Sequence, residues 1–203
     1  LDKNKDGGLI VYDMLTQETF HINENNNLLN SNYVNDIAID KNENIWVASD
    51  DGLIYFSSYN PRLITNYIIP NDGSQYLFRG IRINTIEDDY AGNIWLGTDN
   101  GIFVFDNLEN KIVYQFNSLN SPILSDTIKS IKFNDLGHAY INTSDGLVSL
   151  NTFLEKPYND LYDFKAYPNP LNLREEDRLF FSGLTDGNYI KITSLSGEKI
   201  IEI

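Results

Sequence analysis

The strongest constraint on the fold is an internal repeat. A turn, an apolar strand, an Asp/Asn-Gly turn and a second strand occur together three times, at 43–56, 92–106 and 137–150, and Gly7–Tyr12 preserves the end of a fourth copy. The second glycine of each copy sets the register, with spacings of 44, 49 and 45 residues between Gly8, Gly52, Gly101 and Gly146. A period of roughly 40 to 50 residues built from short strands is typical of β-propeller blades.

Each complete copy predicts an antiparallel blade of up to four strands. The expected strands are Val34–Ile39, Ile45–Ala48, Leu53–Phe56 and Thr65–Ile69, then Ile83–Glu87, Ile94–Gly97, Ile102–Phe105 and Lys111–Phe116, then Ile128–Phe133, Ala139–Asn142 and Leu147–Leu150. Leu9–Tyr12 and Glu18–Ile22 are expected to end an earlier blade. The sequence therefore predicts an all-β fold with the C-terminal part of a propeller, about three complete blades plus a partial one. We expect the chain to be a fragment of a longer protein.

The repeat is lost after Asn151. The segment Phe164–Pro170, FKAYPNP, is interpreted as a rigid junction, and Arg178–Phe181, Tyr189–Thr193 and Lys199–Ile203 are expected to be strands. Ser196-Gly197 favours a hairpin turn between the last two. The prediction is a propeller part at 1–163 and a small, incomplete β-sandwich at 164–203.

Charge and composition exclude several classes of function. The 203 residues carry a formal net charge of −14, and 41% of them are hydrophobic. So acidic a surface repels nucleic acid and anionic lipid, and no apolar run reaches the roughly 20 residues of a transmembrane helix. With no cysteine, disulfides and thiolate metal sites are excluded.

Catalytic groups are few. The chain has two histidines, and His138 stands where the other copies have Asn44 and Asn93, so we interpret it as a turn residue. His21 ends an outer strand without a nucleophile motif nearby. The acidic runs Glu87-Asp88-Asp89 and Glu175-Glu176-Asp177 are interpreted as solvated turns and loops rather than matched acid and base pairs. The prediction is a protein that is not an enzyme and needs no cofactor.

One string resembles the spacing of a calcium-binding loop. Asp2, Asn4 and Asp6 precede Gly7, the glycine expected at the sixth position, and Asp13 holds the twelfth. Gly7–Tyr12 also aligns with a blade strand, so a plain turn is the preferred interpretation and calcium the weaker alternative.

The candidate ligand contacts lie in the segment before Ile83, where additional residues lengthen one spacing of the repeat to 49. This segment holds aromatic and arginine side chains, the residue types that recognition surfaces favour, and arginine suits phosphate or carboxylate groups. We name Tyr76, Arg79 and Arg82 as the candidate ligand-binding residues. The alternative is that Tyr76 and Phe78 only cover the edge of a blade.

Two resemblances bear on function. The pattern over Val34–Leu53, with Ile45-Trp46 and Asp51-Gly52, resembles the propeller repeat of the extracellular sensors of hybrid two-component regulators. Tyr167-Pro-Asn-Pro170 and Tyr189-Ile-Lys-Ile-Thr-Ser-Leu-Ser-Gly197 are similar to the C-terminal sorting domains of the type IX secretion system. Together they resemble a surface component of the complex in which that system attaches its cargo.

These resemblances imply a non-enzymatic protein at the outer-membrane surface. It would bind anionic lipopolysaccharide or another glycan and assist a partner sortase among other outer-membrane secretion proteins. The alternative is the periplasmic ligand-sensing propeller of a hybrid sensor kinase. A second alternative is a glycan-active propeller enzyme whose catalytic groups come from other blades.

Overall fold

Within the described residues, the regular secondary structure consists of β-strands apart from one turn of 3-10 helix, Glu24–Asn26. The computed structural model describes residues 7–26, 28–60, 64–66, 78–107, 111–152, 154, 156–157, 161, 164–168, 172, 178–194 and 196–203. Its contacts define two compact units, Leu1–Leu154 and Glu155–Ile203. The domain boundary expected after residue 163 stays a prediction.

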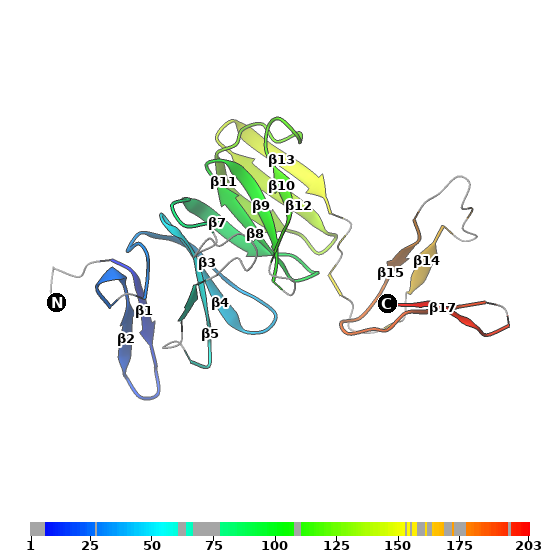
Figure 1. The fold of residues 1–203 in the computed structure, drawn as a ribbon, viewed down its shortest axis with the longest axis horizontal. Coiled ribbons are helices and arrows are strands. Elements are labelled where there is room, and N and C mark those ends of the chain that lie inside the picture. The colour runs from blue at the N-terminus through cyan, green and yellow to red at the C-terminus, as the bar shows by residue number, and fades with distance from the viewer. Residues whose placement is uncertain are drawn as a thin grey trace. The chain divides into compact units, whose positions relative to one another are not determined.

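The first unit is a series of antiparallel sheets (Figure 1). The half-blade consists of β1 (Leu9–Tyr12) and β2 (Thr19–Ile22), and the first blade consists of β3 (Val34–Ile39), β4 (Asn44–Ser49), β5 (Gly52–Ser57) and β6 (Ile64–Asn66). The second blade consists of β7 (Ile83–Asp88), β8 (Asn93–Thr98), β9 (Gly101–Asp106) and β10 (Lys111–Phe116). The third blade consists of β11 (Ile128–Phe133), β12 (His138–Thr143) and β13 (Gly146–Asn151). Strands adjacent in sequence pair in every sheet. The all-β propeller prediction is confirmed. Of the strand expected at Thr65–Ile69, the last three residues lie outside the described part of the chain.

The repeated glycine connects each blade to the next one. Gly52 N–H donates to the Ile81 carbonyl at 3.0 Å, and Gly101 N–H donates to the Asp126 carbonyl at 2.8 Å. Gly101 has a φ of 97°, and a Cβ added there would lie 2.1 Å from the Phe116 carbonyl oxygen. Only glycine adopts this conformation without strain and leaves that space free.

The hydrophobic core lies between the blades. Buried side chains of the first and second blades form one cluster, which includes Trp46, Leu53, Ile86 and Phe105. A second cluster joins the second and third blades, and a third joins the half-blade to the first blade. The inner strands β4, β5, β8 and β9 are buried without alternation, because the first and second blades are covered on both faces, whereas β12 and β13 of the third blade alternate between more buried and more exposed residues.

The second unit contains two small hairpin-like sheets. β14 (Lys165–Tyr167) pairs with β15 (Phe180–Ser182), and β16 (Lys191–Thr193) pairs with β17 (Lys199–Glu202). The interpretation of Phe164–Pro170 as a rigid junction missed a strand, because its centre forms β14, where Tyr167 stacks on Phe180 with ring centroids 5.6 Å apart. Among the described residues, no helix is long and apolar enough to cross a bilayer.

Candidate functional site

The blades expose two sets of turns, at opposite ends of their inner strands. We call the end where β3, β7 and β11 begin the strand-start edge, and the other end the strand-end edge. The pairing of Val34 with Ser49 and of Ile83 with Thr98 places the turns after β4 and β8 at the strand-start edge. Comparing equivalent positions in the three blades separates residues that build the fold from residues that are available for binding.

Buried carboxylates at the strand-end edge hold the turns together. Asp40 Oδ1 accepts the backbone N–H groups of Asn42 and Asn44, and its Oδ2 accepts the side chains of Asn44 and Trp46. Burial acts to raise the pKa of Asp40, but these four hydrogen bonds outweigh it and hold the pKa below its ordinary value of 3.8. Asp89 accepts the same set from the second blade, including Trp95 Nε1 at 2.9 Å. These acids are structural.

The third blade uses a neutral version of this turn. Asn134 replaces the aspartate, and its Oδ1 accepts the backbone N–H groups of Leu136 and His138. Tyr140 replaces the tryptophan, and its hydroxyl lies 3.4 Å from Asn134 Nδ2. His138 begins β12 directly after this turn, as Asn44 and Asn93 begin β4 and β8.

The other acids of the run 87–89 also have structural surroundings. Glu87 forms an ion pair with Lys132 of the next inner strand at 2.6 Å. Burial, and then the charges of Glu87, Asp40 and Asp89, raise the pKa of Asp88. Within the described ranges, no group of three or more His, Asp or Glu side chains could hold a metal ion. Asp2, Asn4 and Asp6 lie outside those ranges, so the calcium alternative stays a prediction.

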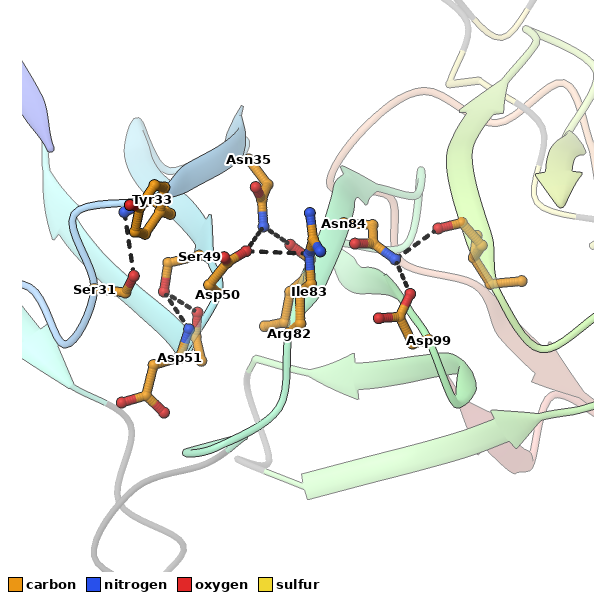
Figure 2. Close-up of polar contacts among 12 residues, drawn as sticks. Ser31, Tyr33, Asn35, Ser49, Asp50, Asp51, Arg82, Ile83, Asn84 and Asp99 are labelled. Carbon is orange, nitrogen blue, oxygen red and sulfur yellow. Dashed lines mark hydrogen bonds and ion pairs between the residues drawn. The ribbon is translucent and has the colours of Figure 1, made fainter. Parts of the chain in front are cut away.

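The strand-start edge carries a repeated polar contact that joins one blade to the next (Figure 2). Asn35 Nδ2 donates to Asp50 Oδ1 at 2.8 Å and to the Ile83 carbonyl at 2.9 Å. Asn84 repeats the arrangement, donating to Asp99 Oδ1 at 2.8 Å and to the Ile128 carbonyl at 3.0 Å. The third blade has Lys129 and Ser144 at the corresponding positions.

An arginine on the turn before β7 distinguishes the contact between Asn35 and Asp50 from the contact between Asn84 and Asp99. Arg82, directly before β7, places its Nε 3.1 Å from Asp50 Oδ1, and both side chains are partly exposed, at 55% and 36% (Figure 2). The residue equivalent to Arg82 before β11 is Thr127, so Asp99 has no arginine at that position.

The turn at 78–82 is firmly anchored. Phe78 is 5% exposed and packs edge-on against Phe103, with ring centroids 5.1 Å apart. Its carbonyl accepts the Ile81 N–H at 2.9 Å, and Asp51 Oδ1 accepts the Gly80 N–H. Phe78 therefore belongs to the core between blades, while Arg79 and Arg82 are exposed on its surface.

Of the predicted ligand residues, Arg79 and Arg82 lie on this one turn, and Tyr76 lies outside the described residues. The structure adds three residues that sequence reasoning missed: Asn35, Asp50 and Tyr33, whose side chain is 73% exposed at the same edge. A position-by-position comparison of the copies contains the signal, because Tyr33, Arg82 and Thr127 occupy equivalent positions and differ in chemistry.

Residues 28–51 match the family model described as Two component regulator propeller. This segment covers the entry to the first blade and the strands β3 and β4. No curated protein matches the sequence significantly. The first complete copy of the predicted repeat thus matches a two-component-regulator propeller repeat over these residues.

Two solved structures share the fold. PorZ, an essential bacterial surface component of the type-IX secretion system of Porphyromonas gingivalis, superimposes with a TM-score of 0.62 at 24% identity, over 94% of this chain and 28% of that chain. The extracellular domain of the hybrid two component system BT3049 from B. thetaiotaomicron gives 0.56 at 24% identity, over 72% and 19%. The present chain spans less than a third of the length of either. At this identity the similarity establishes the fold.

Proposed function

We propose that this chain is part of a non-enzymatic recognition and scaffold protein of the bacterial cell surface, working within type IX secretion. Its ligand is an anionic glycan such as lipopolysaccharide, and its partners are outer-membrane secretion proteins including a sortase. The structural similarity to PorZ over most of the chain supports this assignment over other surface functions.

The observation that supports an anionic ligand is the anchored turn that holds Arg79 and Arg82. Arginine binds phosphate and carboxylate groups through charge-assisted hydrogen bonds, and Arg82 already holds one carboxylate, that of Asp50. Because Phe78 fixes the turn in the core, little conformational entropy is lost when a ligand binds there. The chain carries a net charge of −14 and repels anions as a whole, so binding of an anionic ligand depends on the local pair of arginines at this turn.

Binding of purified lipopolysaccharide to the full-length protein tests this proposal. The double variant Arg79→Ala/Arg82→Ala should lose about tenfold in affinity, as expected for charged hydrogen bonds. The control Lys41→Ala/Lys191→Ala removes the same charge from exposed positions elsewhere and should bind like the wild type. Equal losses in both variants would reduce the effect to net charge and overturn the site.

A second candidate function is the ligand-sensing propeller of a hybrid two-component kinase. The match of residues 28–51 to the two-component regulator repeat and the similarity to BT3049 favour it. Co-purification distinguishes the two: the secretion proposal expects the full-length protein to be recovered with outer-membrane secretion proteins. Ligand-dependent autophosphorylation of the same polypeptide would establish the sensor instead.

A further inference from the structure

The strand-start edge contains a carboxylate at the place where an anionic ligand would bind. Arg82 Nε and Asn35 Nδ2 both point to one oxygen, Asp50 Oδ1, at 3.1 and 2.8 Å (Figure 2). These two donors form a cradle that holds an anion, and the anion present belongs to the protein itself. The cradle is open to solvent, since the Arg82 and Asp50 side chains are 55% and 36% exposed.

From this geometry we propose that Asp50 is a specificity-determining residue that competes with the external anion for Arg82. The inference rests on the proposed function, because it concerns the same ligand and the same turn. A phosphate or carboxylate on a glycan would take the position of the Asp50 carboxylate on Arg82. Only ligands whose anionic group binds Arg82 better than Asp50 does would be retained.

The energetics allow this exchange. Exposed ion pairs contribute little to stability, so displacing the Asp50 carboxylate has a small cost. Asn35 keeps its second bond, to the Ile83 carbonyl at 2.9 Å, when Asp50 moves away. The contact between the two blades therefore persists while the anion is exchanged. Two further charged residues lie nearby in sequence: Asp51, whose Oδ1 accepts the Gly80 N–H, and Arg79 on the turn at 78–82.

The repeats supply both the test variant and its control. The third blade has Ser144 at the position of Asp50, so Asp50→Ser introduces a residue that the equivalent turn of the third blade contains. Asp99→Ser removes an equal charge from the equivalent turn of the second blade, where Asn84 donates to Asp99 and Thr127 replaces the arginine. The two variants differ in whether they release an arginine.

Calorimetric titration of the full-length protein measures the effect with three probes: mannose 6-phosphate, mannose and inorganic phosphate. Asp50→Ser should bind mannose 6-phosphate about two- to fivefold more tightly than the wild type, matching the strength of an exposed ion pair. Asp99→Ser should bind as the wild type does, and mannose should bind no variant more tightly. A gain with inorganic phosphate as well as with the phosphosugar would identify the phosphate group itself as the ligand, and a gain with the phosphosugar alone would identify the sugar phosphate.

Three results overturn the inference. If the wild type binds and Asp50→Ser is no tighter, Asp50 does not compete, while the proposed function stands. If Asp50→Ser and Asp99→Ser gain equally, the effect is general electrostatics. If no variant binds either the phosphosugar or lipopolysaccharide, the proposed ligand fails and the inference fails with it.

Discussion

The indole N–H of Trp46 donates to Asp40 Oδ2 at 2.9 Å, in the buried interface between the first and second blades. The second blade repeats this pair with Trp95 and Asp89 at the same distance. The third blade replaces both members, with Asn134 and Tyr140. A carboxylate that accepts the donors of its own turn and an indole that needs an acceptor therefore occur together and are replaced together.

Asp40→Asn should destabilise the protein by about 1–3 kcal/mol, because an amide presents a donor to groups that already donate. The double variant Asp40→Asn/Trp46→Tyr reproduces the third blade and should lose less than the sum of the two single changes. Urea unfolding measures both, with Glu43→Gln on the same turn as an exposed control. Strict additivity would contradict the coupling of the pair.

The stabilisation from Asp40 should depend on pH. Its folded-state pKa lies below its ordinary value of 3.8, so its contribution is present above that value and is lost as the pH falls through the folded pKa. The difference in unfolding free energy between the wild type and Asp40→Asn should therefore shrink on acidification from pH 6 towards the acid transition. A difference that stays constant would exclude a role for the carboxylate charge.

In contrast to Asp40→Asn, the substitution Asp88→Asn should stabilise the protein at neutral pH. Burial and neighbouring acids raise the pKa of Asp88 above 3.8, so the unfolded chain loses this proton first as the pH rises. The folded state is then penalised, fully so above its raised pKa. Melting curves should show a higher Tm for Asp88→Asn at pH 7 and a smaller gain near the acid transition. A lower Tm at pH 7 would contradict the burial of an unfavourable charge.

The two glycines Gly101 and Gly80 should respond differently to alanine. Both have positive φ, 97° and 75°, but an added Cβ at Gly101 meets the Phe116 carbonyl oxygen at 2.1 Å and at Gly80 meets nothing within 4 Å. Gly80→Ala should destabilise the protein by about 1–2 kcal/mol, because alanine is strained in a left-handed backbone conformation. Gly101→Ala should cost about 3 kcal/mol or more, since backbone must also move. Chemical denaturation compares them, and equal costs would contradict the tight contact.

Asn84→Ala should weaken the junction between the second and third blades. The Ile128 carbonyl would lose its side-chain donor, and we expect a loss of about 1–2 kcal/mol. Lys129→Ala is the matched change, because Lys129 is exposed at the same position of the next blade and should have little effect. Hydrogen exchange should show faster exchange in β11 for Asn84→Ala alone.

The fold could be predicted because its signals are local. The turn glycines, the strands around Trp46 and Trp95 and the Asp-Gly turns each depend on neighbouring residues, and the copies reinforce one another. The strand β14 within 164–170 was not predicted, because a three-residue strand is defined by its pairing with β15 and not by its own sequence pattern.

The candidate site was only partly predictable, because it depends on contacts between blades. Asn35 meets Asp50 and Ile83, which are 15 and 48 residues away in sequence, and no local pattern indicates such a pairing. Arg79 and Arg82 were identified from composition. Phe78 was expected, as the alternative to a ligand contact, to cover the edge of a blade, and its side chain is buried in the core between the first and second blades.

The most direct test of the recognition edge is hydrogen–deuterium exchange of the full-length protein with and without lipopolysaccharide. We expect protection in the turns at 49–52 and 78–82, with no change in the strand-end turns at 40–44 and 89–93. Protection that is confined to the strand-end turns, or that is the same in Arg79→Ala/Arg82→Ala as in the wild type, would contradict recognition at the strand-start edge.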